Sequence, residues 1–194
     1  MAVPVTSNNE RPRLLGPAEE GRLLAQREAR LKPLVMTALN IGFRPSELFS
    51  LTWKDVDLQR WSITVRAAYA KNGESRSVPM NDILTTTLEE VRISSMGRGL
   101  VFLNRQGTPY KSFRTAFERA VLKVAIPDCT FHLLRHTFAS RLGMAGVDLP
   151  TGKELIGYKD IKMTLRYTHL SSDHKHAAVS KLEQFRTKSH QCSQ

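Results

Sequence analysis

The chain has 194 residues, of which 41% are hydrophobic and 24% are charged, an ordinary balance for a soluble globular domain. Its 29 Lys and Arg residues outnumber 18 Asp and Glu residues, and the net charge of +11 attracts polyanions, usually nucleic acid. A ribosomal protein or a membrane-surface protein would have the same balance. We expect neither a membrane span, which needs an apolar run of roughly 20 residues, nor a signal peptide. Cys129 and Cys192 lie too far apart for a metal-binding pair, which indicates a reducing, cytoplasmic setting.

The chain opens with a polar stretch punctuated by prolines, and we interpret residues 1–12 as a linker or tail. Because a linker normally joins two folded parts, we expect this chain to be the C-terminal part of a longer protein, with a naturally short protein as the alternative. Pro17, with acidic residues at positions 19 and 20, is typical of the first turn of a helix. Pro33 predicts the start of a second helix.

A small antiparallel sheet is predicted near the middle of the chain. Residues 42–48 indicate a turn that leads into a short helix, and the alternating, β-branched residues 61–67 indicate a strand. Asn72 and Gly73 form a strong hairpin signal, with residues 75–79 as the returning strand.

The rest of the pattern is helical. Helices are predicted around residues 81–95, 110–125, 131–145, 151–157, 161–167 and 174–186. Thr151, with Glu154 three residues later, predicts a capping box at the start of one of them. The predicted fold class is therefore α+β, mainly α, with one small antiparallel sheet.

Two candidate site residues lie at a helix start and a third lies at the hairpin. Arg44 follows a turn, and its planar guanidinium would bind a phosphate oxygen. The alternative is that Arg44 only caps a surface loop. Glu47, one helical turn on, would hold Arg44 in place or lie on the helix surface. Lys71 could protonate a leaving hydroxyl as a general acid, although a lysine in a turn is more often a solvated charge.

His132 and Arg135 are three residues apart in a predicted helix, so both can reach one small anion. His132 could accept a proton from a nucleophile or donate to a phosphate oxygen, while Arg135 would bind the same phosphate. A packed helical histidine beside a surface arginine is the plainer alternative. His136 is expected to point away from this face and to be structural.

Tyr167 is the candidate nucleophile. A phenol has a pKa near 10, so it attacks only where positive charge or a base activates it. Arg166 and His169 flank Tyr167, which is also what an ordinary amphipathic surface would look like. Phosphoryl transfer needs little beyond positioning and cations around the phosphate oxygens, so these side chains would suffice without a metal.

Taken together, these segments closely resemble the catalytic domain of the tyrosine recombinases, the phage integrases and Xer-type resolvases. The matching stretches are GFRPSELFSLTWKDVD, KNGESRSVPM, FHLLRHTFASRL and DLPTGKELIGYKDIKMTLRYTHLS. The resemblance runs from about Arg13 to Leu170 and implies a catalytic domain at residues 13–173. Residues 174–194 would then be a C-terminal helix and tail that could dock on a neighbouring subunit.

The resemblance assigns the family's active-site positions to named residues here. They are Arg44, Lys71, His132, Arg135, Tyr158 and Tyr167, with Glu47 in support. The position of Tyr158, nine residues before the nucleophile, is usually His and sometimes Trp in the family. A phenol still donates one hydrogen bond but carries no positive charge, so we expect retained, reduced activity.

The activity implied by the resemblance is DNA strand cleavage and rejoining through a 3′-phosphotyrosyl intermediate, without metal, cofactor or ATP. The implied partner is double-stranded DNA in the nucleoid. The full-length protein would act as a homotetramer on DNA, and this chain alone would be mainly monomeric. The alternatives are a type IB topoisomerase, which shares this chemistry, and a DNA-binding module of weakened catalysis. A metal-dependent nuclease is disfavoured because the sequence has no suitable carboxylate cluster.

Overall fold

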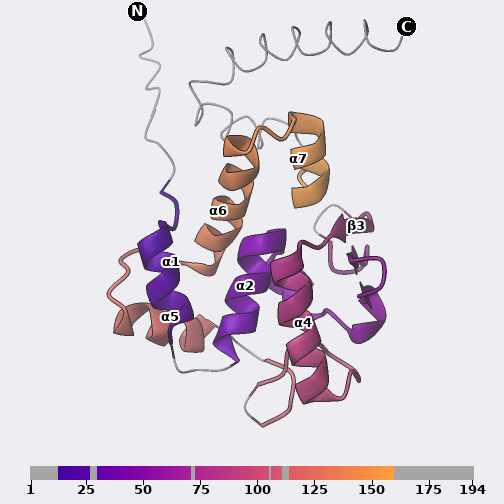
Figure 1. Cartoon of the computed structure of the whole chain (residues 1–194), viewed down its shortest axis with the longest axis horizontal. Coiled ribbons are helices and arrows are strands. Elements are labelled where there is room, and N and C mark those ends of the chain that lie inside the picture. The colour runs from indigo at the N-terminus through magenta and orange to yellow at the C-terminus, as the bar shows by residue number, and fades with distance from the viewer. Residues whose placement is uncertain (1–12, 27–29, 71–72, 105, 111–113, 160–194) are drawn as a thin grey trace, which may run out of the picture.

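The computed structural model describes residues 13–26, 30–70, 73–104, 106–110 and 114–159 of the chain. In this part, helices pack around a central helix, and a three-stranded sheet lies at one side (Figure 1). The predicted fold class, mainly α with a small antiparallel sheet, is confirmed. No helix in this part is long and apolar enough to span a membrane. Two predicted helices, 161–167 and 174–186, lie outside the described residues.

The helices follow the expected order along the chain. Their bounds are α1 Pro17–Leu24, α2 Leu31–Ile41, α3 Pro45–Phe49, α4 Asp82–Ser95, α5 Arg114–Lys123, α6 Phe131–Met144 and α7 Leu149–Ile156, with a 3-10 turn at Trp53–Asp55. Prolines in the first turns of α1, α3 and α7 mark three of these starts. A proline ring fixes φ at a helical value, and the backbone N–H that it lacks would have no acceptor within the helix at this position. The second helix begins at Leu31, two residues before Pro33.

The N-cap of α7 differs from the predicted one. Asp148 precedes the helix, and its side-chain oxygen accepts a hydrogen bond from the backbone N–H of Thr151 at 3.0 Å. The helix therefore starts about one turn earlier than predicted. The predicted capping box of Thr151 and Glu154 was wrong. Asp148 is the better cap because Pro150 already belongs to the first turn of the helix.

Helix α2 is the centre of the core and packs against both α6 and α4 (Figure 1). Its apolar side chains are buried on several faces, so the helix is surrounded rather than laid on a surface. The fully or nearly fully buried residues of α2 are Leu31, Leu34, Val35, Thr37, Ala38, Leu39 and Ile41. This buried helix fixes the position of the turn at its C-terminal end.

The sheet has three antiparallel strands in the order β1, β2, β3, with bounds Val56–Asp57, Ser62–Val65 and Arg76–Pro79. The pairing of β2 with β3 confirms the predicted hairpin, but β1 was not predicted. Val65, the last residue of β2, pairs directly with Arg76, the first residue of β3, so the paired strands stop well short of the predicted two-residue turn at Asn72 and Gly73. Two residues of β1 are too few to show an alternation in the sequence.

Gly42 ends α2 and turns the chain towards α3. Its φ is 65°, in the left-handed region, and a Cβ atom there would lie 2.3 Å from Cδ1 of Phe138. Only glycine satisfies both requirements, because another residue would be strained in its backbone and would collide with the ring. Gly42 thus brings the end of α2 into direct contact with α6.

Gly42→Ala is expected to lower the free energy of unfolding by about 2–5 kcal/mol, from left-handed strain and overpacking. Urea unfolding measures this loss. The matched control is Gly21→Ala in α1, where a new Cβ meets nothing within 4 Å. That change should be neutral or stabilise by about 0.5–1 kcal/mol. Equal losses in the two variants would contradict the role given to Gly42.

Candidate active site

A buried carboxylate lies at the start of α3. Glu47 is only 2% exposed. One of its oxygens, Oε2, accepts the backbone N–H of Arg44 at 2.8 Å, as expected for a glutamate in the third position of a helix. The other oxygen, Oε1, accepts Nη1 of the Arg44 side chain at 3.0 Å. Glu47 therefore holds Arg44 in place, as one of the two predictions stated.

A second arginine reaches the same carboxylate from the sheet. Arg76, the first residue of β3, donates from Nη1 and Nη2 to the two oxygens of Glu47, each at 3.0 Å. This bidentate geometry is the strong form of an arginine–carboxylate pair. The Arg76 guanidinium also lies over the ring of Phe43, 5.7 Å from its centroid.

A third arginine comes from α6. Arg135 is 1% exposed, and its Nη1 donates to the carbonyl oxygen of Gly42 at 2.6 Å and lies 4.0 Å from Oε2 of Glu47. Its guanidinium faces the ring of Tyr158, 4.9 Å from the centroid. Nε of Arg135 is buried and has no hydrogen-bond acceptor within the described part of the chain. The Nε–H of the buried Arg135 guanidinium thus makes no hydrogen bond in the described part of the chain.

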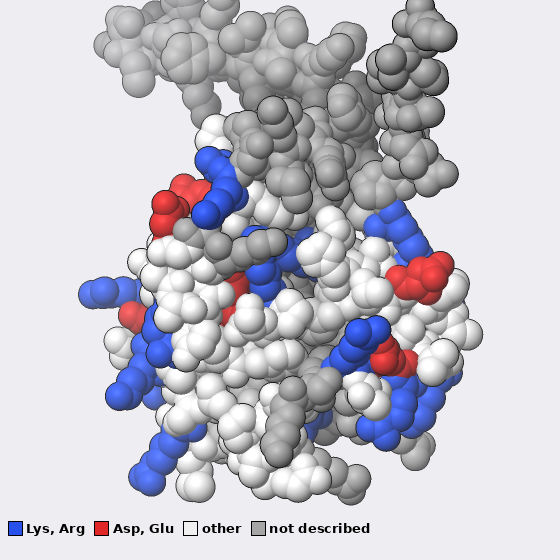
Figure 2. Space-filling view, turned by 180° about the vertical axis from the view of Figure 1, so that it is seen from behind, with Lys and Arg blue, Asp and Glu red and all other residues white. Residues whose placement is uncertain are grey.

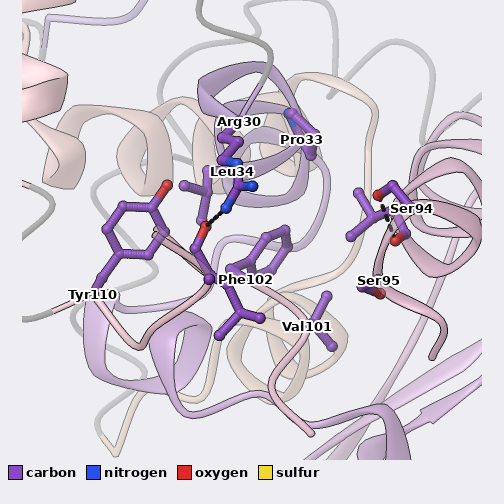
Figure 3. A pocket seen from close by; sticks show the side chains of 11 residues that line it. Arg30, Pro33, Leu34, Ser94, Ser95, Val101, Phe102 and Tyr110 are labelled. Carbon is purple, nitrogen blue, oxygen red and sulfur yellow. Dashed lines mark hydrogen bonds between the residues drawn. The ribbon is translucent and has the colours of Figure 1, made fainter. Parts of the chain in front are cut away.

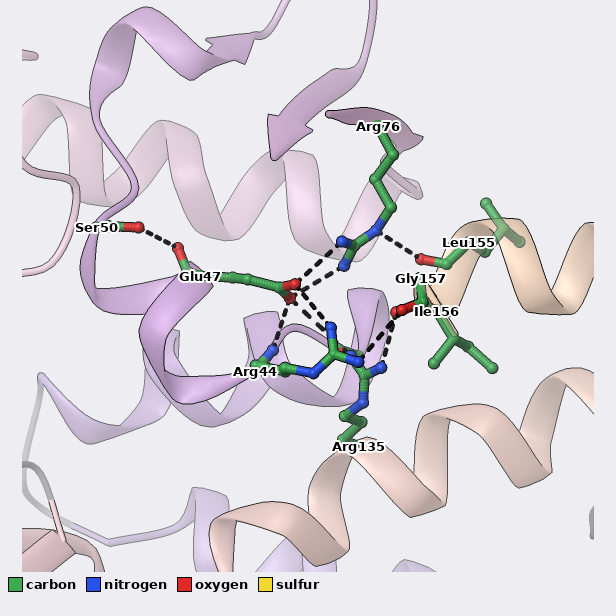
Figure 4. A network of polar contacts seen from close by, with 9 residues as sticks. Arg44, Glu47, Ser50, Arg76, Arg135, Leu155, Ile156 and Gly157 are labelled. Atoms are coloured by element: carbon green, nitrogen blue, oxygen red, sulfur yellow. Dashed lines mark hydrogen bonds and ion pairs between the residues drawn. The ribbon is translucent and has the colours of Figure 1, made fainter. Parts of the chain in front are cut away.

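The three arginines also converge on the C-terminal end of α7 (Figure 4). Arg76 Nε donates to the carbonyl of Leu155 at 3.4 Å, and Arg135 Nη2 donates to that of Ile156 at 2.8 Å. Arg44 Nη2 donates to the carbonyl of Gly157 at 3.2 Å. The last carbonyls of a helix lack partners within the helix and carry partial negative charge, so cations stabilise them. Each arginine therefore joins α7 to a different element.

The cluster carries an excess of positive charge. Three guanidiniums share the single carboxylate of Glu47, which leaves two uncompensated positive charges. Burial alone raises the pKa of Glu47, but hydrogen bonds from Arg76 and the Arg44 backbone and the charges of Arg76 and Arg135 outweigh it. The pKa of Glu47 is therefore lowered. Burial, with the nearby charge of Arg44, lowers the pKa of Arg135 to about 10, so it stays protonated at neutral pH.

The structure brings Arg44, Glu47, Arg135 and Tyr158 into one cluster. His132 lies one turn before Arg135 on α6, with an exposed side chain.

The ring of His132 lies edge-on to that of His136, with centroids 4.4 Å apart. The expectation that His136 points away from this face was therefore wrong, because residues four apart on a helix are neighbours. Lys71 and Tyr167 lie outside the described residues.

Sequence reasoning missed Arg76. The signal was present, because Arg76 and the buried Val78 are two residues apart and so share one face of their strand. A charged residue on the apolar face of a strand is unusual and needs a buried partner. The partner, Glu47, is 29 residues away in the chain, so the sequence pattern alone could not identify it.

Basic side chains are spread around the face shown in Figure 2, where acidic ones are fewer. A separate hollow of about 390 Å³ lies between the start of α2, the end of α4, residues 101–103, Gly107 and Tyr110 (Figure 3). Its walls are mostly apolar, and Arg30 there donates to the carbonyls of Leu103 and Asn104. Within the described ranges, no three His, Cys, Asp or Glu side chains gather so that they could hold a metal ion.

Glu47→Gln is expected to destabilise the fold by about 3–5 kcal/mol, because it leaves buried guanidiniums without their counter-charge. The pKa of Glu47 is lowered in the folded state, so its ionised carboxylate stabilises the fold at neutral pH. This stabilisation should be lost as pH falls below the ordinary pKa of 4.5 towards the folded-state pKa. Urea unfolding of both proteins as a function of pH measures this difference.

The matched control is Glu118→Gln, which removes an exposed carboxylate that pairs with Arg114 on the surface of α5. Solvent screens such pairs, so this variant should unfold like the wild type. A difference between wild type and Glu47→Gln that stays constant down to strongly acidic pH would contradict the assigned ionisation.

Comparison with known proteins identifies a family. The model of the phage integrase family matches residues 5–174. The integrase of Salmonella phage P22 is 32% identical over 179 residues, which are 86% of this chain and 46% of that protein. Tyrosine recombinase XerA of Saccharolobus solfataricus is 36% identical over 142 residues, covering 73% of this chain and 46% of that protein. The chain thus spans about half the length of these relatives.

Solved structures agree with the fold. The catalytic domain of bacteriophage HP1 integrase is 31% identical, with a TM-score of 0.67, and the match covers 86% of this chain and 93% of that one. The Tn1549 transposon integrase in complex with circular intermediate DNA is 27% identical, with a TM-score of 0.72, over 88% of this chain and 67% of that one. The family match covers most of the chain, and the P22 integrase and XerA exceed 30% identity. The chain belongs to the phage integrase family.

Proposed function

We propose that this chain is the catalytic domain of a site-specific DNA recombinase, which cuts and rejoins DNA strands through a covalent phosphotyrosyl intermediate. The single observation that carries the proposal is the cluster of Arg44, Arg76 and Arg135 around one buried carboxylate. A solved relative in complex with DNA supports DNA as the substrate. The site of action would be the nucleoid in the cytoplasm.

The charge of the cluster supports phosphoryl transfer. A phosphodiester carries one negative charge, and a second develops as a nucleophile adds to phosphorus. The two uncompensated positive charges of the cluster match this dianion. Preorganised cations at developing charge are commonly the largest contribution to such catalysis. Burial of Arg135 strengthens its attraction for an anion, because little water screens it.

In the proposed reaction, the hydroxyl of Tyr167 attacks the phosphorus atom in line. A bond forms between the phenolic oxygen and phosphorus, and the bond to the 5′ oxygen breaks. Lys71 gives a proton to this leaving oxygen, while Arg44 and Arg135 hold the non-bridging oxygens. The 5′-hydroxyl of a partner strand then attacks the phosphotyrosine and releases Tyr167, so the energy of the ester bond is conserved.

His132 and Tyr158 would assist as further donors to the phosphate oxygens or, for His132, as acceptor of the tyrosyl proton. The ring of Tyr158 lies against the Arg135 guanidinium, which supports its place beside the same phosphate. The reaction uses side-chain cations instead of a metal, so chelators should not inhibit it.

Two other functions are distinguished by their products. A type IB topoisomerase would relax supercoiled plasmid and yield no recombinant. A DNA-binding module of weakened catalysis, for which the phenol at Tyr158 is the motive, would bind DNA and form no adduct. The arginine cluster would be complete in both cases. An adduct assay therefore identifies the binding module, and an assay for relaxed against recombinant plasmid identifies the topoisomerase.

Tyr167→Phe is expected to abolish the covalent protein–DNA adduct that wild type forms with a nicked suicide substrate, because no hydroxyl remains to attack. Tyr158→Phe should keep the adduct and lower its rate by up to about 100-fold, through loss of one donor. Denaturing gels of the trapped adduct measure both.

Tyr110→Phe is the control for the same chemical change, since Tyr110 lines the separate hollow. It should leave the adduct unchanged. An adduct that persists in Tyr167→Phe would move the nucleophile to another residue.

We further propose that the full-length protein assembles as a homotetramer on DNA, while this chain alone is monomeric without DNA. Light scattering of the chain should therefore give a mass close to the 21.9 kDa of one copy. A stable tetramer without DNA would refute this expectation.

Affinity for DNA should fall steeply with salt, because the contacts of a basic chain with phosphates release counterions.

A further inference from the structure

The side chain of Arg76 links three elements, β3, α3 and α7. It stands on the core-facing side of β3, and its side chain is only 8% exposed. The guanidinium donates to both oxygens of Glu47 and to the carbonyl of Leu155, and it rests over the ring of Phe43. The guanidinium therefore has polar partners along its edge, shown in Figure 4, and an aromatic ring on one face.

The end of α7 is shaped to accept this side chain. Gly157 has a φ of 74°, and a Cβ atom added there would lie 2.7 Å from Cζ and Nη1 of Arg76. A larger residue at this position would displace the guanidinium. The position of Arg76 is thus set by the backbone of α7 as well as by its ion pair.

The orientation of Glu47 depends on Arg76. A carboxylate has two oxygens with about four acceptor positions. On Glu47, Arg76 takes one on each oxygen, while the backbone N–H and the Nη1 of Arg44 take two others. Oε2 also lies 4.0 Å from Nη1 of Arg135. Without the fork of Arg76, the carboxylate could turn towards the remaining guanidiniums and change where both of them point.

We propose that Arg76 is a positioning residue of the candidate active site, which acts through the Glu47 carboxylate to fix the guanidiniums of Arg44 and Arg135. The inference rests on the proposed function for its effect on DNA cleavage, but its structural part concerns the protein alone. Lysine cannot replace Arg76 in this role, because a single ammonium lacks the planar fork that meets both oxygens.

The first test reads the two phosphate-binding arginines directly, without DNA. The Nε–Hε signals of Arg44 and Arg135 are recorded by NMR in the full 194-residue chain, for wild type, Arg76→Lys and Arg76→Gln. Arg76→Lys keeps the charge and one hydrogen bond, so it serves if the glutamine variant does not fold. In the folded variants, the signals of both arginines should shift or broaden. Unchanged signals from both would overturn the proposal.

The second test is a double-mutant cycle on adduct formation at saturating DNA. Arg76→Gln should slow cleavage by about 10–100-fold, the size expected when a catalytic group is displaced by a fraction of an ångström to one ångström. In a Glu47→Gln background, Arg76→Gln should add less than about a 3-fold further loss, because both changes break one interaction. Losses that multiply independently would overturn the proposal.

The matched control is Arg66→Gln. Arg66 directly follows the last residue of β2 and pairs with Asp55 rather than with Glu47. It should change neither the arginine signals nor the cleavage rate at saturating DNA. If wild type forms no adduct that depends on Tyr167, the proposed function fails, and the NMR test still decides whether Arg76 positions the two arginines.

Discussion

The carboxylate of Glu47 is the interaction on which the arrangement of this site depends. A buried acid is costly unless charges and donors surround it, and three buried or half-buried guanidiniums are costlier still without one. Glu47 and its arginines therefore partly compensate one another's charge, which allows them to lie buried or half-buried inside the protein. Because Arg44, Arg76 and Arg135 come from α3, β3 and α6, this single group ties together elements that are far apart in the chain.

The C-terminal end of α7 is the second half of the same arrangement. Its last carbonyls, on Leu155, Ile156 and Gly157, each accept a hydrogen bond from a different arginine of the cluster. The arginines are thus held between a full negative charge on one side and the negative end of a helix on the other. In the proposed reaction, a phosphate bound here would meet guanidiniums whose directions are already set, so little reorganisation would be required.

Local signals made much of this fold readable from the sequence, and the exceptions have physical reasons. Prolines and acids mark the starts of α1 and α3, and β-branched alternation marks β2. Arg44 and Glu47 could be paired because they are one turn apart. Arg76 could not, because its partner is fixed by the register of β3 against β2 and by tertiary contacts between β3, α7 and Glu47. Strand β1 was missed because its two residues carry no periodicity.

Tyr158 shows how the cluster tolerates an unusual residue. The resemblance places His or Trp at this position in most of the family. A phenol differs from imidazole in that it cannot carry positive charge, and it differs from both in its donor group. What the three share is a flat aromatic ring. Here the ring lies 4.9 Å from the Arg135 guanidinium, within the range of a cation–π contact. A cation buried to this extent gains more from such a ring than an exposed one does, since water does not compete for it. The ring can therefore keep Arg135 in place even where the hydrogen-bonding group at its edge has changed. Packing against Arg135 is therefore a constraint on position 158 that is separate from the proposed donation to the phosphate.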